Sequence, residues 1–179
     1  MHIFLTGEKR IGKTTTIREF LKKTGATADG FVTYWERHSD EERRLYLAPY
    51  SAAPEQNERY IVATDKGQDP KDPGRGKGLR FSESTLEAFN THGTKILENS
   101  GKNDYIMMDE LGFLETKAPV FRQAVLHRID GAVPIIGVIK GSKTEFLETI
   151  RYHPNVTIRE VTAENREEIL EWMINKHDR

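Results

Sequence analysis

Gly7-Glu8-Lys9-Arg10-Ile11-Gly12-Lys13-Thr14 is the stretch that decides the fold of this 179-residue chain. It fits the pattern GxxxxGK[ST], follows the short apolar run Ile3-Phe4-Leu5, and opens a segment with helical apolar spacing. The glycines let backbone N–H groups approach a phosphate, the lysine reaches the β- and γ-phosphates, and the threonine hydroxyl can ligate Mg²⁺. The sequence therefore predicts a nucleotide site made by Gly7, Glu8, Lys9, Arg10, Ile11, Gly12, Lys13, Thr14 and Thr15.

A carboxylate pair at the end of an apolar run, in Asp104-Tyr105-Ile106-Met107-Met108-Asp109-Glu110, supplies the second half of such a site. The run predicts a strand buried on both faces, with the acids at its C-terminal edge, where open parallel sheets bind ligands. Asp109 and Thr14 are the predicted Mg²⁺ ligands, since this metal takes hard oxygen donors. Glu110 and Lys13 are the predicted catalytic residues, and Glu110 would orient and deprotonate the attacking water.

The rest of the chain is predicted to alternate between β-strands and α-helices. Strands are expected over 3–5, 105–108, 135–139 and 156–161, and helices over 13–23, 83–98, 120–129, 143–151 and 164–176. Three more strands, over 31–36, 45–50 and 60–63, are separated by polar turns at 37–42 and 54–58 and are expected to form an antiparallel extension at one sheet edge. The predicted class is a three-layer α/β/α fold with a mostly parallel sheet, in one domain spanning 1–179.

Four segments together resemble a known family: LTGEKRIGKTTTI, DGFVTYWER, YIMMDELGFLE and, near the end, VTAENREEIL. They are similar to the small nucleoside-triphosphatases often called cancer-related nucleoside-triphosphatases, over nearly the whole chain. The resemblance implies a RecA-like domain that hydrolyses ATP, GTP and other nucleoside triphosphates with Mg²⁺ and loose base selectivity. It implies that Lys13 is the loop lysine, Thr14 and Asp109 the metal ligands, and Glu110 the water-activating glutamate. Asn165 and Arg166 match the family's C-terminal signature.

Several other residues are weaker candidates. The segment 65–80 is rich in glycine, proline and cations, so it is either a solvated loop, the favoured reading, or a lid that brings Arg75, Lys77 or Arg80 to the phosphates. Lys140 ends a predicted strand and is a possible γ-phosphate sensor, with a plain surface cation as the alternative.

Three further residues, Asn165, Arg166 and Glu115, each leave two interpretations open. Asn165 and Arg166 either contact the nucleotide or begin the last helix together with Thr162. Glu115 either caps the following helix, which is favoured, or orders water near the metal.

Composition narrows the possible partners. There is no cysteine, which excludes disulfides and a thiol nucleophile, and the 27 basic and 28 acidic residues leave a net charge of −1. We therefore expect nucleoside triphosphates as ligands, no nucleic acid, no membrane and a cytoplasmic location, with no protein partner indicated. A small-molecule or nucleotide kinase and a nucleotide-binding switch with slow hydrolysis stay open as alternatives.

Overall fold

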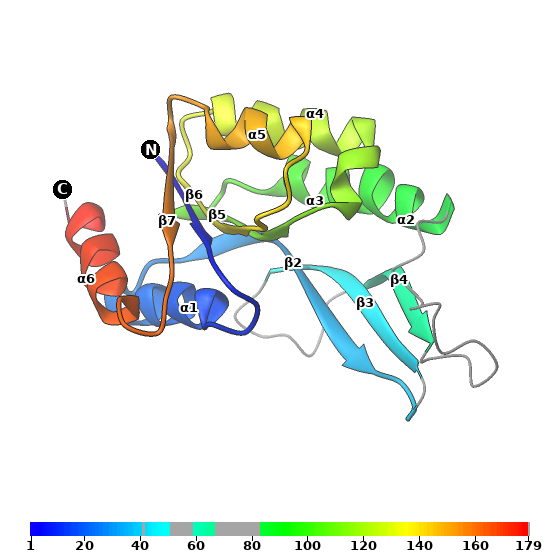
Figure 1. Cartoon of the computed structure of the whole chain (residues 1–179). Helices are drawn as coiled ribbons and strands as arrows, with labels where there is room; N and C mark the ends of the chain where they lie inside the picture. Colours follow the sequence, from blue (N-terminus) through cyan, green and yellow to red (C-terminus); the bar gives the residue numbers. More distant parts are fainter. Residues whose placement is uncertain (41, 51–58, 67–82, 179) are drawn as a thin grey trace.

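The computed structural model describes residues 1–40, 42–50, 59–66 and 83–178. Within them lies one seven-stranded sheet with the order β4-β3-β2-β5-β6-β1-β7 (Figure 1). The strands are β1 (His2–Thr6), β2 (Ala28–Arg37), β3 (Glu42–Pro49), β4 (Tyr60–Lys66), β5 (Tyr105–Leu111), β6 (Ile135–Ile139) and β7 (Val156–Glu160). The helices are α1 (Lys13–Thr24), α2 (Glu83–Glu87), α3 (Thr94–Asn99), α4 (Pro119–Asp130), α5 (Glu145–Arg151) and α6 (Arg166–His177).

The parallel part of the sheet is built from short, nearly continuous apolar runs. Strand β1 pairs in parallel with β6 and β7, and β5 pairs in parallel with β2 and β6. All five residues of β6 are buried, as expected for a strand covered by helices on both faces. Because parallel strands end at the same sheet edge, the residues that follow β1, β5, β6 and β7 meet there.

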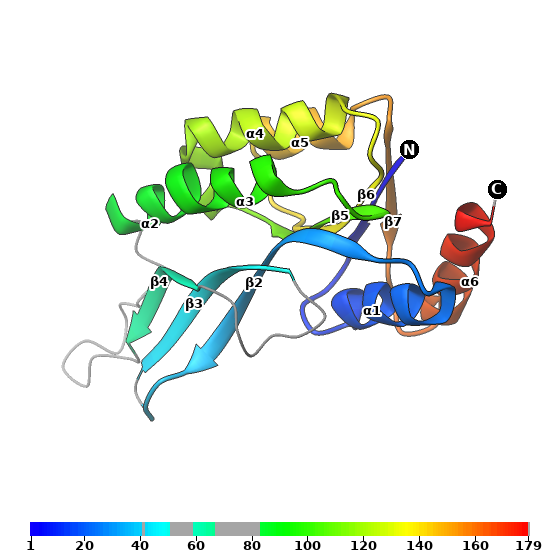
Figure 2. The ribbon, with the colours of Figure 1, turned by 180° about the vertical axis from the view of Figure 1, so that it is seen from behind.

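The antiparallel extension lies on one side of this parallel sheet. Strand β3 pairs with both β2 and β4 in antiparallel fashion, and β2 joins the extension to β5. The extension reaches away from the helical layers in both views (Figures 1 and 2). The predicted fold class, including the antiparallel edge, is confirmed, while the predicted turn at 54–58 lies outside the described residues.

Two apolar cores fill the space between the sheet and its helices. One face is covered by α2, α3, α4 and α5, and the other by α1 and α6 (Figures 1 and 2). Strand side chains alternate between the cores: Ile106 and Met108 pack with the first, and Tyr105 and Met107 with the second. The result is the predicted three-layer arrangement.

Several helix boundaries differ from the sequence prediction; α6, for example, begins at Arg166 and not at 164. The single helix expected over 83–98 is divided, because a π-helical segment, Ala88–Gly93, separates α2 from α3. Gly93 lies in that segment, where an added Cβ would come within 2.8 Å of the Phe121 ring, so close packing against α4 accounts for this glycine. Helix α5 begins later than expected and is capped by Thr144, whose hydroxyl accepts a hydrogen bond from the Leu147 N–H.

Among the described residues, no helix is both long enough and apolar enough to cross a membrane.

Candidate active site

The loop between β1 and α1 has the backbone geometry of a phosphate cradle. Gly7 and Gly12 have φ values of 128° and 104°, a region that side-chain-bearing residues rarely adopt. A Cβ on Gly7 would lie 2.4 Å from the Val161 carbonyl oxygen, so the loop touches the end of β7. Gly12 occupies the N-cap position of α1 without any side-chain cap, which leaves the helix N-terminus open to an anion.

Lys13 is folded back over this loop. Its ammonium donates hydrogen bonds to the carbonyl oxygens of Gly7, at 2.9 Å, and Glu8, at 2.6 Å. Lys9, Arg10 and Thr15 are exposed around the loop, and Arg10 is the one non-glycine residue with positive φ in the described part of the chain. The lysine thus sits over the cradle with a charge that a phosphate oxygen can attract.

Asp109 joins the loop to the centre of the sheet. Asp109 is only 6% exposed, and its carboxyl lies close enough to the Thr14 hydroxyl for that hydroxyl to lower its pKa. Burial raises the pKa of Asp109 to about 6, and the nearby Thr14 hydroxyl acts in the opposite direction by lowering it. The Thr14 hydroxyl and the desolvated Asp109 carboxylate are oxygen donors that fit a hard divalent cation, whose charge would offset the cost of burying that carboxylate. Among the described residues, no group of three or more His, Asp or Glu could hold a metal alone.

Glu110 stands at an irregularity in the sheet. The register of β5 against β6 shifts between Asp109 and Leu111, so Glu110 is an extra residue in the strand. Such bulges turn a side chain out of the regular alternation, often beside an active site. The Glu110 carboxylate pairs with Lys140 at the end of β6, with 2.6 Å between Nζ and Oε1. The predicted catalytic acid and the predicted sensor lysine are therefore in direct contact.

Arg166 and Asn165 lie at the start of α6, and Arg166 approaches the phosphate loop. A Cβ on Gly12 would be 3.2 Å from Cδ and Nη1 of Arg166, which places this exposed arginine beside the phosphate loop. The Asn165 amide is engaged elsewhere: it accepts from the Thr162 N–H at 2.8 Å and donates to the Glu160 carbonyl at 2.9 Å. Asn165 thus fixes the turn between β7 and α6, from which Arg166 reaches the loop.

A family model described as NTPase matches residues 2–174 of the chain. The chain belongs to this NTPase family. The family resemblance found in the sequence motifs is thereby confirmed.

Named relatives span almost the same length as this NTPase-family chain. The nucleoside-triphosphatase THEP1 of Thermotoga maritima is 30% identical over 95% of this chain and 91% of its own length. The cancer-related nucleoside-triphosphatase of Homo sapiens is 30% identical over 94% of this chain and 92% of its own length.

Solved structures show the same fold. The solution structure of a human cancer-related nucleoside triphosphatase matches 98% of this chain and 96% of its own, with a TM-score of 0.67 and 26% identity. The crystal structure of THEP1 from Aquifex aeolicus matches both chains fully, with a TM-score of 0.63 and 24% identity.

Glu115 does not cap the following helix, so the favoured reading is wrong. The residue is 4% exposed and lies in a 3-10 turn, Leu114–Lys117, where its Oε2 accepts from the Gly112 N–H at 2.9 Å. Burial raises the pKa of Glu115 to about 7, opposed by hydrogen bonds from its own N–H and that of Gly112. Asn90 caps α4 instead: its Oδ1 accepts from the N–H groups of Val120, at 3.0 Å, and Phe121, at 3.2 Å.

Sequence reasoning missed two residues at this NTPase site. Arg18 faces Asp109 closely enough to lower the pKa of that carboxyl. The signal was present, since Arg18 follows Thr14 by one helical turn and shares its face of α1. The Thr33 hydroxyl accepts a hydrogen bond from the Glu110 N–H at 3.3 Å, and no local motif announces that contact across the sheet. Arg75, Lys77 and Arg80 lie outside the described residues.

Proposed function

We propose that this chain is a Mg²⁺-dependent nucleoside-triphosphatase that releases the γ-phosphate by in-line attack of water. The observation that carries the proposal is the meeting of two distant segments: the Thr14 hydroxyl lies beside the buried Asp109 carboxyl, and Glu110 follows directly on the same strand. A phosphate cradle, a pair of oxygen donors and a carboxylate within one site match the parts that nucleotide hydrolysis uses. The family membership and the names of the relatives support the same reaction.

The binding role falls to the loop and the start of α1. Backbone N–H groups between Gly7 and Thr14 would hold the β- and γ-phosphates, together with the N-terminal dipole of α1. Lys13 would exchange its two carbonyl partners for phosphate oxygens when a nucleotide binds. Arg166 would contact the nucleotide from beside Gly12, held in place by the turn that Asn165 fixes. Glu8, Lys9, Arg10, Ile11 and Thr15 complete the proposed binding set.

The metal role falls to Thr14 and Asp109. These two side chains would hold Mg²⁺, which would supply neutralisation of the charge that develops on the phosphoryl oxygens. A site with only two protein ligands suits Mg²⁺, which is usually held by one or two carboxylates and by substrate phosphates.

The chemical role falls to Glu110. A water oxygen attacks the γ-phosphorus, the bond from that phosphorus to the β–γ bridging oxygen breaks, and its electron pair leaves with the nucleoside diphosphate. Glu110 accepts the proton that the water loses. Arg75, Lys77 and Arg80 are further candidates for cations that stabilise the charge developing on the phosphates, whereas the Lys140 ammonium is paired with Glu110.

A phosphate-release assay tests this function against its rivals. We expect the wild type to release inorganic phosphate from ATP and GTP without any acceptor, with kcat/KM values for the two nucleotides within about tenfold. The loose selectivity follows because the proposed contacts are to phosphates. Phosphate transfer that requires an added small molecule would instead identify a kinase, and tight binding without turnover would identify a switch.

A further inference from the structure

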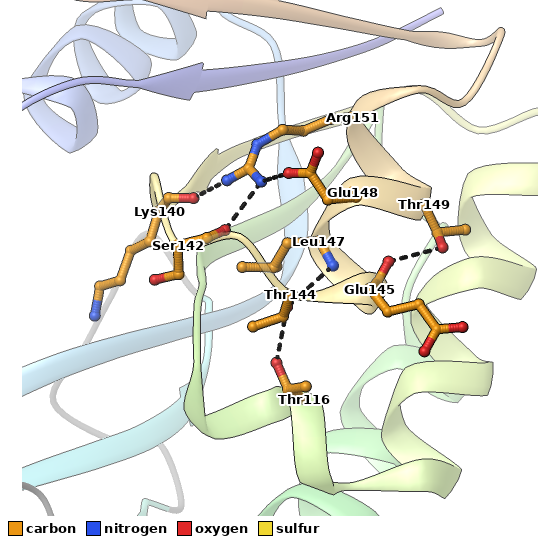
Figure 3. Close-up of polar contacts among 9 residues, drawn as sticks. All are labelled: Thr116, Lys140, Ser142, Thr144, Glu145, Leu147, Glu148, Thr149 and Arg151. Carbon is orange, nitrogen blue, oxygen red and sulfur yellow. Dashed lines mark hydrogen bonds and ion pairs between the residues drawn. The ribbon is translucent and has the colours of Figure 1, made fainter.

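The lysine that contacts the catalytic glutamate is held at its backbone by a network of its own. The Lys140 N–H donates to the Leu111 carbonyl at 2.9 Å, and its carbonyl oxygen accepts from the Arg151 guanidinium. Arg151 also donates to the Ser142 carbonyl at 3.0 Å and pairs with Glu148. Figure 3 shows the Lys140 side chain extending away from Arg151, while its carbonyl faces that side chain. The network thus fixes the point from which the lysine side chain starts.

The loop that follows β6 also contacts the turn that carries Glu115. The Thr144 hydroxyl lies 3.2 Å from the Thr116 hydroxyl. This contact, drawn in Figure 3, links the loop after β6 to the turn that carries Glu115. None of these contacts uses the Lys140 ammonium. Removing that charge therefore leaves the loop's anchors intact.

The stem of Lys140 runs over a residue without a side chain. A Cβ on Gly112 would lie 2.9 Å from Cδ of Lys140 and 3.5 Å from Oε2 of Glu115. Gly112 is buried, so the Lys140 stem packs directly on the Gly112 backbone, and the Glu115 carboxyl lies beside Gly112. A larger residue at position 112 would push the lysine from this path. The arrangement directs the ammonium toward Glu110.

The ion pair itself is partly open to solvent. The Lys140 side chain is 45% exposed and that of Glu110 is 30% exposed. Exposed pairs of this kind contribute little to folding stability, typically 0–1 kcal/mol. A contribution to folding stability therefore does not explain why the anchored backbone of Lys140 and the close approach of its stem to Gly112 direct the ammonium to one oxygen of Glu110.

We propose that Lys140 is a positioning residue for Glu110, holding Oε1 so that the other carboxylate oxygen is presented to the attacking water. This inference rests on the proposed role of Glu110 as the acceptor of the water proton. It assigns Lys140 a partner within the protein, in place of direct contact with the γ-phosphate. Since orientation of a reacting group matters in the transition state, its loss lowers kcat and leaves substrate binding almost unchanged.

Lys140→Met is the decisive variant, because methionine keeps an unbranched apolar stem over Gly112 and removes the charge. We expect kcat to fall about tenfold with KM for Mg-ATP within about twofold, and Lys140→Arg to recover most of the rate. Gly112→Ala keeps the lysine but displaces its stem, so kcat should fall in the same direction by a smaller factor. Lys143→Met, an exposed residue of the same loop, is the matched control and should retain wild-type constants.

A double-mutant cycle with Glu110→Gln separates positioning from an independent role. If Lys140 acts through Glu110, Lys140→Met has no further effect on kcat in the Glu110→Gln background. Multiplying effects, an unchanged kcat, or a raised KM with normal kcat would overturn the proposal; the last would identify a phosphate contact. Failure of the proposed function looks different. In that case Glu110→Gln would turn over at the wild-type rate, and the positioning role would fall with it.

Discussion

The two halves of the site are built in different ways. The phosphate-binding half is one continuous stretch, Gly7 to Thr14, whose shape comes from glycines with positive φ and from the start of a helix. The reaction half is assembled from β5, the turn that follows it and the end of β6, and it depends on side-chain contacts such as Glu110 with Lys140 and Glu115 with Gly112. Thr14 and Asp109, whose side chains lie close together, join the halves.

This contrast separates two kinds of consequence. A cradle made of backbone fails when the backbone cannot take its conformation, so changes there affect folding and binding together. A reaction centre made of side chains can lose one group while the fold persists, so changes there affect turnover. Substitutions on each side therefore test whether the division holds.

Gly7→Ala is expected to have the largest effect on the binding half. Its Cβ would meet the Val161 carbonyl oxygen at 2.4 Å, and alanine is strained at a φ of 128°. We expect the variant to lose roughly 1–3 kcal/mol of unfolding free energy and most of its nucleotide affinity. Urea unfolding and calorimetric titration with Mg-ATP measure both.

Gly141→Ala is the matched control, because an added Cβ there meets no atom within 4 Å. It should behave as wild type. Equal stability and affinity for Gly7→Ala would show that the loop does not depend on this glycine.

Lys13→Ala should have the next largest effect, confined to binding. The variant loses a charge-assisted contact to phosphate, so affinity for Mg-nucleotide should fall tenfold or more, which is about 1.4 kcal/mol. Lys22→Ala, at the exposed end of the same helix, should bind as the wild type does. Equal affinities of Lys13→Ala and wild type in calorimetry would contradict the assignment of the loop from Gly7 to Thr14 as the phosphate-binding site.

The two halves also differ in what the sequence alone could reveal. The cradle was predictable because each role depends on neighbours in the chain: the glycines, the lysine and the helix start lie within a few residues. The alternation of strands and helices was predictable for a related reason, since buried apolar runs such as the one ending at Asp109 have a clear pattern.

The remaining features depend on which distant segments pack together. Asn90 caps α4 from another helix, which displaced the cap expected from Glu115. Gly93, in the π-helical segment that divides the expected helix, packs closely against Phe121. The pairing of Lys140 with Glu110 requires the bulge in β5 and the anchored end of β6. No local motif contains that information. The extent of the domain, 1–179, stays a prediction.

Glu115→Gln should give the smallest effect and sharpens the view of the reaction half. The folded state raises the pKa of Glu115 from 4.5 to about 7, so it binds a proton more tightly than the unfolded chain. Stability from this group is therefore present at low pH and is lost as the pH rises from about 4.5 to about 7. Glutamine is neutral and can still accept from the Gly112 N–H.

At pH 8 the Glu115→Gln variant should therefore exceed the wild type in unfolding free energy by on the order of 1 kcal/mol, and at pH 4.5 the difference should shrink. Urea unfolding at the two pH values measures it, with the exposed Glu171→Gln as control. A variant that is less stable at pH 8 would mean that the charged form of Glu115 is favoured in the fold.

The central claim is that binding and turnover belong to separate halves, and Glu110→Gln tests it most directly. Glutamine keeps the size and hydrogen-bonding reach of the side chain but cannot accept the water proton. Measured together, kcat should fall about 10²-fold or more while the dissociation constant for Mg-ATP stays within a few-fold of wild type. Asp109→Asn should instead weaken Mg²⁺ dependence and binding together. Glu110→Gln that turns over near the wild-type rate, or that loses nucleotide affinity in step with its rate, would contradict the account.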